Sequence, residues 1–243
     1  MKPVLIIKTG STLPELRSTR GDFEDWIRDG LGLPPHQVIV ADIRWGAVLP
    51  SPVAIDAAVI TGSHHMVTER LDWSERTAGW LQNVQKTALP LLGICYGHQL
   101  LALAWGGRVA DNPGGREYGT VEVQLTPAAG QDPLFMGIPA SIRVQASHAQ
   151  SVLELPPGAL RLAGSRRDAN QAFRLGPRAW GLQFHPEFDA DITRTYIRHH
   201  RDELSAEGMD PQRLEEAVTP TPPAAGLLHR FAALVRESSA HKP

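Results

Sequence analysis

Short apolar runs along the first hundred residues alternate with stretches in which apolar positions repeat at helical spacing. The apolar runs cover residues 3–8, 37–43, 54–63 and 89–94, and they are rich in Val, Ile, Leu and Ala. Near-continuous runs of this length are typical of strands that are buried on both faces of a sheet. Gly, Ser and Thr follow several of the runs, which supports strands that end in turns.

Helical spacing appears between these runs, at residues 21–33, 74–88 and 96–105. In the second of these stretches Ser74 stands where an N-cap is expected. Strands and helices in this order predict a parallel sheet covered by helices on both faces. Ligands of such sheets bind beyond the carboxyl ends of the strands, so the residues after each run are the first candidates for a site.

The pattern changes after residue 107. Four short segments alternate apolar and polar positions between Pro and Gly turns, and they lie at residues 120–126, 141–147, 151–156 and 160–165. Alternation of this kind predicts antiparallel hairpins, which we place at one edge of the sheet. An apolar strand then returns at 179–188 and is interrupted by Pro186.

The remaining sequence predicts a helix over 189–208 with Asp189 as its N-cap, a proline-rich linker at 219–226, and a last amphipathic helix at 227–237. We therefore predict an α/β fold with a mostly parallel central sheet flanked by helices and antiparallel strands at one edge. We place an α/β domain at residues 1–204 and a helical extension, packed on the same domain, at 205–243.

Composition narrows the class of protein. The chain has 243 residues, 42% of them apolar and 21% charged, with a net charge of −2. This balance is ordinary for a globular protein and argues against nucleic acid or a membrane surface as the main partner. No apolar run reaches the roughly 18 residues of a membrane helix. The single cysteine cannot form an internal disulfide, so we expect a cytoplasmic protein.

That cysteine, Cys95, stands in "LLGICYGHQLLALA" between a predicted strand and a predicted helix. Gly93 and Gly97 flank it in the G-x-nucleophile-x-G pattern of a sharp strand-to-helix turn. The helix N-terminus beneath the sulfur favours the thiolate, and the N–H of Tyr96 would face an oxyanion. The alternative is a cysteine that serves only as a small buried apolar residue.

The segment "GLQFHPEF" supplies a base for such a nucleophile. His185 and Glu187 are two residues apart, so in an extended segment their side chains point the same way. Glu187 could then orient one ring nitrogen of His185 while the other faces the sulfur, as in a catalytic triad. The alternative is a surface turn in which the two side chains merely pair.

These two segments resemble the two signatures of class I, triad-type glutamine amidotransferases, and the order Cys then His-Pro-Glu also matches. The similarity is greatest to the glutaminase domain of GMP synthase and its free-standing relatives. "GREYGTVEV" (115–123) is similar to a further motif of that group, and "ITGSHHMV" occupies the position of its glycine loop. The resemblance implies a flavodoxin-like fold and covers roughly residues 50–190.

The resemblance implies a role for each matching residue. Cys95 would attack the side-chain amide of glutamine, His185 would transfer protons, and Glu187 would orient His185. The backbone N–H groups of Gly62, Ser63 and Tyr96 would form the oxyanion hole. Gln99 would face the bound glutamine. "ASHAQS" is similar to the family's loop that holds the amino-acid end of glutamine, which makes Ser147 and His148 substrate-binding candidates.

Three functions stay open. The first is a glutaminase that releases ammonia through a γ-glutamyl thioester. Any consumption of that ammonia would fall to a separate synthase subunit, because the chain has no P-loop or Gly-rich nucleotide motif. The second is a γ-glutamyl peptidase or hydrolase that uses the same triad on a different small γ-glutamyl molecule. The third is a non-catalytic binding or regulatory subunit.

Other polar side chains have simpler interpretations. We expect no cofactor. We also expect no metal site, since the adjacent histidines His64 and His65 point apart in an extended segment. We expect His98 to pack locally on the predicted helix that follows Cys95, Glu117 to be a local structural carboxylate, and His199–His200 to be solvated.

Overall fold

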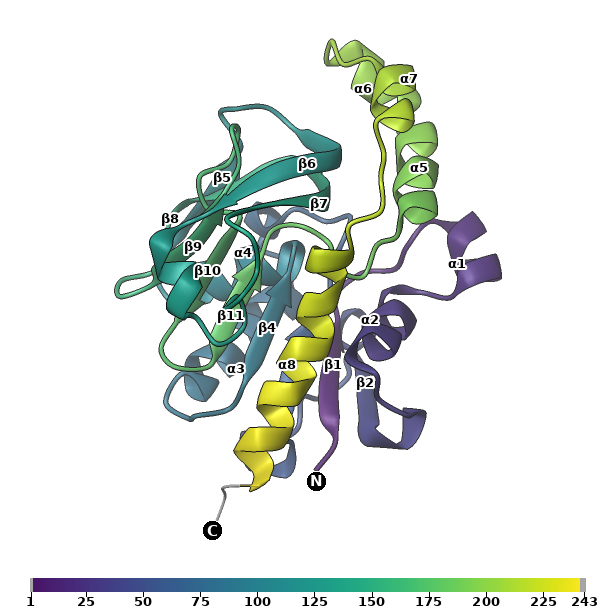
Figure 1. The fold of residues 1–243 in the computed structure, drawn as a ribbon. Helices are drawn as coiled ribbons and strands as arrows, with labels where there is room; N and C mark the ends of the chain where they lie inside the picture. Colours follow the sequence, from purple (N-terminus) through teal and green to yellow (C-terminus); the bar gives the residue numbers. More distant parts are fainter. Residues whose placement is uncertain (1, 241–243) are drawn as a thin grey trace.

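A nine-stranded sheet runs through the middle of the computed structural model, which describes residues 2–240 (Figure 1). Its strand order is β2-β1-β3-β4-β11-β10-β9-β6-β7, and β5 and β8 form a separate two-stranded sheet. The strands are β1 (Val4–Lys8), β2 (Val38–Asp42), β3 (Ala57–Ile60), β4 (Leu91–Ile94), β5 (Arg108–Asp111), β6 (Glu117–Leu125), β7 (Ser141–His148), β8 (Gln150–Glu154), β9 (Leu160–Gly164), β10 (Ala172–Leu175) and β11 (Ala179–Leu182).

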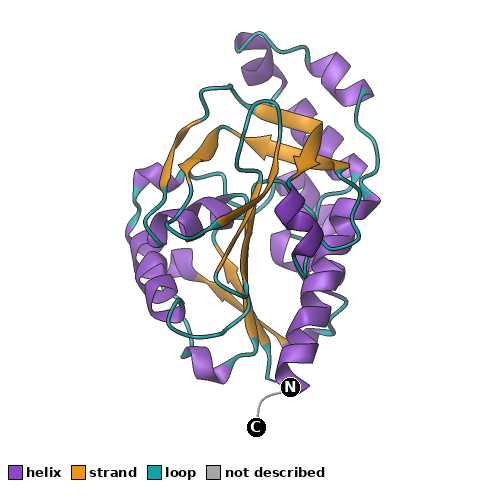
Figure 2. Cartoon of the chain, turned by 60° about the vertical axis from the view of Figure 1, so that its left-hand side comes forward, coloured by secondary structure: helices purple, strands orange, loops and turns teal. Residues whose placement is uncertain are grey.

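Helices cover both faces of this sheet, with the strands as a central layer (Figure 2). The α-helices are α1 (Pro14–Arg20), α2 (Phe23–Leu31), α3 (Asp72–Val84), α4 (Tyr96–Ala104), α5 (Ala190–His199), α6 (Arg201–Ala206), α7 (Pro211–Glu216) and α8 (Pro222–Ala240). Helices α2 and α8 pack together on one face, and α3 packs on α4 on the other.

Alternation along β1 shows how the sequence divides its core between the two faces. Val4 and Ile6 belong to the cluster that α2 and α8 complete, whereas Leu5 and Ile7 belong to the cluster of α3 and α4. All four side chains are essentially fully buried. A strand covered on both sides needs apolar residues at every position, which is why it has no alternating pattern.

Neighbouring strands are parallel from β2 through β11 and antiparallel from β11 through β7. This arrangement confirms the predicted α/β class and the antiparallel edge. One detail differs, because β8 leaves that edge and pairs with β5 instead. The carboxyl ends of β1, β3, β4 and β11 therefore meet at one edge of the parallel part.

Several predicted elements begin or end elsewhere. Helix α3 begins at Asp72, so Ser74 does not cap it but is buried and receives a hydrogen bond from the Tyr96 hydroxyl at 2.7 Å. The predicted single helix over 189–208 is broken at His200 into α5 and α6, although Asp189 does cap it by accepting from the Ile192 N–H at 2.8 Å.

The predicted linker at 219–226 was wrong in its second half, because α8 begins at Pro222. Proline is tolerated in the first turn of a helix, where its missing N–H would have no partner. The helix then buries Leu227, Leu228 and Phe231 against the sheet and α2. The division of the chain at residue 204 stays a prediction. Within residues 2–240, the structure contains no helix that is long and apolar enough to span a membrane.

Candidate active site

Cys95 lies at a sharp turn between β4 and α4. Its backbone has φ 50° and ψ −100°, in a region that residues with side chains rarely adopt. A Cβ at Gly93 would lie 2.4 Å from the Gly97 carbonyl oxygen, and one at Gly97 would lie 2.5 Å from the Ile60 carbonyl oxygen. The two glycines therefore allow the backbone contacts that this turn requires.

His185 and Glu187 follow β11, which lies next to β4 in the sheet. The backbone N–H of Cys95 donates to the Leu182 carbonyl at 2.8 Å, so the two strand ends are tied together. His185 Nδ1 lies 2.8 Å from Glu187 Oε1, and both side chains are buried. The pair is therefore part of the interior, not a surface turn.

The electrostatics of His185 depend on its two neighbours. Burial by itself lowers the pKa of His185, but the Glu187 carboxylate and the Cys95 sulfur outweigh it and raise this pKa to about 10. The ring also stacks on Phe188 at a centroid distance of 4.1 Å. Packing and charge together hold the imidazole in place and favour its protonated form beside the sulfur.

The loop after β3 approaches the same point. A Cβ built on Gly62 would lie 3.1 Å from His185 Cε1 and 3.8 Å from Cys95 Cβ. Within residues 2–240, the backbone N–H groups of Gly62, Ser63 and Tyr96 have no protein acceptor. Free N–H groups beside a nucleophile are the arrangement that can stabilise an oxyanion.

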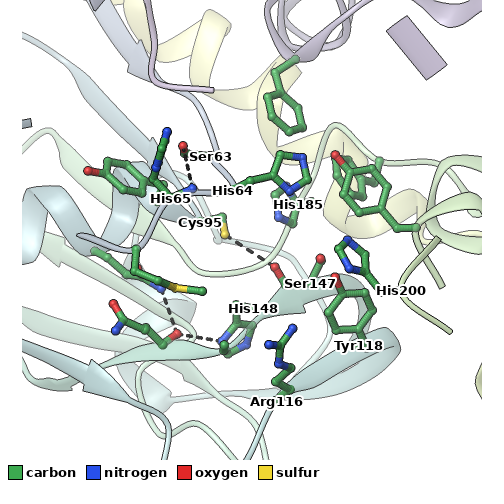
Figure 3. Close-up of a pocket in the computed structure, with 18 of the residues that line it drawn as sticks. Ser63, His64, His65, Cys95, Arg116, Tyr118, Ser147, His148, His185 and His200 are labelled. Atoms are coloured by element: carbon green, nitrogen blue, oxygen red, sulfur yellow. Dashed lines mark hydrogen bonds between the residues drawn. The ribbon is translucent and has the colours of Figure 1, made fainter. Parts of the chain in front are cut away.

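The end of β7 forms the opposite side of the site. The Ser147 carbonyl oxygen lies 3.8 Å from Cys95 Sγ, and Figure 3 shows the sulfur between His185 on one side and Ser147 and His148 on the other. The segment "ASHAQS" (146–151), which the resemblance implied to be a loop, comprises mainly the last residues of β7 and the first residues of β8.

Buried hydrogen bonds hold His148. Its Nε2 lies 3.2 Å from Glu117 Oε2 and its Nδ1 lies 3.0 Å from the Gln150 carbonyl. Glu117 also accepts from Ser165 at 2.7 Å. These contacts agree with the structural role expected for Glu117, and they connect it to the site through His148.

Gln99 lines the same cavity from the first turns of α4. Its amide nitrogen donates to the Gln150 carbonyl at 2.8 Å and to Gln183 Oε1 at 3.0 Å. An amide nitrogen has two N–H donors, so both are used within the protein. Only the oxygen of the Gln99 side chain is left for a ligand.

Glu117, His148 and Asp168 form the one group among the described residues whose donor atoms lie close enough together to hold a metal ion. Each of them already makes protein hydrogen bonds; Asp168, for example, accepts from Ser151 at 2.7 Å. A buried network whose atoms are satisfied by the protein itself supports a structural role better than a metal centre. His98 is buried against the Phe173 ring, and burial lowers its pKa to about 3.

Residues of the C-terminal helices close one side of the cavity, which has a volume of about 250 Å³. The His64 ring stacks on Tyr196, with a centroid distance of 5.8 Å and an angle of 4° between the rings. Burial and the neighbouring histidines lower the pKa of His64. Glu203 in α6 and His200, the residue before α6, line the same cavity.

The prediction of a solvated His199–His200 pair was therefore half wrong. His199 is exposed and lies 3.4 Å from Glu15, but His200 contacts Tyr118 and His64 and faces the cavity (Figure 3). The break between α5 and α6 turns His200 inward. His65 points away from His64 and lies 3.1 Å from Glu69.

Sequence reasoning missed several residues of the cavity: Phe23, Arg116, Tyr118, Phe188, Tyr196, His200 and Glu203. Arg116 and Tyr118 lie in the "GREYGTVEV" segment, whose similarity to a family motif assigned no role to either residue. Most of the others come from helices, where the sequence has no local pattern that marks a site. Phe188 could have been found, since it directly follows the His-Pro-Glu segment.

Comparison with known proteins places this geometry in a family. A family model described as "Glutamine amidotransferase class-I" matches residues 48–201. The glutamine-hydrolyzing GMP synthase of Thermotoga maritima is 37% identical over 133 residues, which are 55% of this chain and 24% of that protein. A glutamine-hydrolyzing GMP synthase subunit of Thermococcus kodakarensis is 37% identical over 122 residues, or 48% of this chain and 63% of that protein.

The chain thus spans about a quarter of the length of the first of these relatives and less than two thirds of the second. Among solved structures, the crystal structure of a glutamine amidotransferase from Thermotoga maritima is similar over 98% of this chain and 99% of that one. The TM-score is 0.76 and the sequence identity 25%.

Proposed function

The chain belongs to the class I glutamine amidotransferase family, and on that premise we propose that it hydrolyses the γ-amide of glutamine through Cys95, His185 and Glu187. The observation that carries the proposal is the position of Cys95. It lies on a strained turn, between a buried His–Glu pair and backbone N–H groups that have no protein acceptor within residues 2–240. These are the parts that acyl transfer needs.

The reaction follows from these positions. The Cys95 thiolate attacks the amide carbon, and the carbonyl oxygen becomes an oxyanion that the N–H groups of Ser63 and Tyr96 stabilise. His185 gives its proton to the nitrogen as the C–N bond breaks, and ammonia leaves. Water then attacks the γ-glutamyl thioester with His185 as the base, which releases glutamate and restores the thiol.

Substrate contacts complete the proposal. Both N–H groups of the Gln99 side-chain amide are already used within the protein. Its oxygen therefore accepts a hydrogen bond from the α-ammonium group of the bound substrate. Ser147 and His148 shape the opposite side at the end of β7. The Thermococcus relative is itself named as one subunit of a GMP synthase, which supports a synthase on a separate chain as the consumer of the ammonia.

A second candidate is a hydrolase of γ-glutamyl compounds with a larger amine. The cavity that holds Cys95 and His185 also includes His64, Tyr196 and His200. These three side chains form a wall of the cavity. Ammonia is too small to contact it, whereas an amino acid or other amine released beside His185 would fill the space in front of it. This wall favours a larger leaving group, and the triad chemistry would be the same.

One screen separates the candidates. Purified wild-type protein and Cys95→Ala are incubated with glutamine and with a panel of γ-glutamyl amino acids and γ-glutamyl amines, and the released ammonia or amine is measured. Release from glutamine by the wild type alone supports the glutaminase, and release from larger amides alone supports the second candidate. If neither protein cleaves any compound, both fail and a non-catalytic binding role becomes the better account.

A further inference from the structure

The segment that follows β1 lies directly behind the Gly62–Ser63 loop. A Cβ at Gly10 would lie 2.6 Å from the Ser63 Cα, so only glycine allows this approach without displacement. Thr9, the residue before it, is completely buried, as is Thr61 at the end of β3. The first 47 residues lie outside the match to the family model, yet this segment contacts the part of the site next to Cys95.

Two threonine hydroxyls meet at one carbonyl group in this contact. Thr9 Oγ1 and Thr61 Oγ1 each lie 2.9 Å from the Gly62 carbonyl oxygen. Thr9 Oγ1 also lies 2.9 Å from the Thr61 carbonyl oxygen and 3.0 Å from Thr61 Oγ1, so its single proton is shared within this cluster. Thr61 Oγ1 in turn accepts from the Thr9 backbone N–H at 3.0 Å. The Gly62 carbonyl is thus held on the buried side of the loop by a clamp formed from the ends of two neighbouring parallel strands.

The orientation of that carbonyl fixes the next N–H. In a planar trans peptide the C=O and the following N–H point in opposite directions, and none of the described peptide bonds is cis. Holding the Gly62 oxygen against the threonines therefore directs the Ser63 N–H away from them. Ser63 lines the cavity, and Gly62 adjoins His185 and Cys95, so that direction is toward the site.

We propose that Thr9 is a positioning residue of the oxyanion hole, which acts by locking the Gly62–Ser63 peptide with its N–H facing the Cys95 sulfur. The inference rests on the proposed acyl transfer at Cys95. Without the Thr9 hydroxyl the Gly62 carbonyl keeps only the Thr61 hydroxyl, which belongs to the adjacent residue and moves with the same loop. The peptide is then less firmly held, and in a rotated peptide a carbonyl oxygen would face the developing negative charge. Because the oxyanion exists only in the transition state, the loss is expected in kcat and not in KM.

The test compares Thr9→Val, which keeps the shape but removes the hydroxyl, with Thr9→Ser, which restores it. Thr77→Val is the matched control, since Thr77 is equally buried but donates to the Trp73 carbonyl within α3. We expect Thr9→Val to lower kcat on the best γ-glutamyl substrate by about 10-fold with KM within about twofold, which is less than the full loss of one oxyanion donor. Thr9→Ser and Thr77→Val should keep the wild-type kcat.

Crystal structures of the same variants test the inference independently of turnover. We expect the Gly62–Ser63 peptide to rotate or to occupy two orientations in Thr9→Val and to keep one orientation in the other two. A single unchanged orientation in Thr9→Val, or a kcat loss no larger than that of Thr77→Val, would overturn the role of Thr9. If Thr9→Val does not fold, Thr9→Ala serves in the same comparison. A wild-type protein that cleaves no amide would count against the proposed function. The orientation of the Gly62–Ser63 peptide in the crystal structures would still show whether Thr9 holds that peptide.

Discussion

The two sides of the active-site cavity are built in different ways. On the sheet side, strand ends fix Cys95 and His185 through backbone contacts, and the side chains are buried. On the helical side, Glu203 lies in the short helix α6 and His200 directly precedes that helix. They are held by ring contacts and exposed ion pairs, such as the one between Arg116 and Glu203 at 3.5 Å. The difference suggests that the sheet side supplies the chemistry and the helical side the choice of leaving group.

The largest effect is expected on the sheet side from Glu187→Gln. Glu187 holds His185 at 2.8 Å, and loss of such an orienting carboxylate lowers kcat by about 10²- to 10⁴-fold in triad enzymes. The carboxylate also raises the pKa of His185, so its removal lowers that pKa. His185 must be protonated to release the amine, and the alkaline limb of the pH profile of kcat/KM should therefore move to lower pH.

This limb is measured from kcat/KM of both proteins between neutral and alkaline pH. In the wild type the protonated fraction of His185 falls as the pH passes the pKa of about 10. An alkaline limb at the same pH in Glu187→Gln would contradict the assigned role of the carboxylate.

The next effect concerns the strained turn itself. Gly93→Ala places a Cβ 2.4 Å from the Gly97 carbonyl oxygen, so the turn must shift. Overpacking of this kind costs about 1–3 kcal/mol in the free energy of unfolding, and kcat should fall with it because Cys95 moves. Urea denaturation measures the free energy of unfolding, and steady-state kinetics measure kcat.

Gly79→Ala provides the matched control, since nothing lies within 4 Å of a Cβ at that position in α3. Alanine is favoured over glycine in a helix, so this variant should be as stable as the wild type or more stable, with normal activity. Equal stability changes in the two variants would show that the turn at Cys95 is not as tight as its geometry indicates.

The smallest effect is expected on the helical side. His200→Ala removes a ring that faces the cavity but leaves the triad intact. KM for γ-glutamyl compounds with a large amine should rise about three- to tenfold, the range of a modest pocket contact, while kcat/KM for glutamine stays unchanged. His199→Ala is the control, because His199 is exposed and lies beside Glu15. If His200→Ala changed the turnover of glutamine as strongly as that of the larger compounds, the helical side would not be selecting the leaving group, contrary to this account.

The same contrast explains what could be predicted from the sequence. Cys95, His185 and Glu187 lie in local patterns, a G-x-Cys-x-G turn after an apolar strand and a His-x-Glu segment after another, so their positions in the fold follow from neighbouring residues. The parallel sheet could be predicted for the same reason, since its strands are continuous apolar runs.

The helical side could not be predicted in this way. His200 faces the cavity only because α5 ends there and α6 turns away, and the sequence predicts one continuous helix. Thr9 reaches the site through the pairing of β1 with β3, two strands about fifty residues apart in the chain. Proline at 222 suggested a linker, but tertiary burial of Phe231 and its neighbours makes the segment the first turn of α8.

The central claim is that Cys95 forms a γ-glutamyl thioester, and the most direct measurement is the intact mass of the protein after rapid acid quenching of the reaction. Wild-type protein mixed with its best substrate should gain the mass of one γ-glutamyl group, mapped to the peptide that contains Cys95, and Cys95→Ala should gain none. Release of ammonia or amine by Cys95→Ala at the wild-type rate, or turnover by the wild type with no adduct at any quench time, would contradict the account.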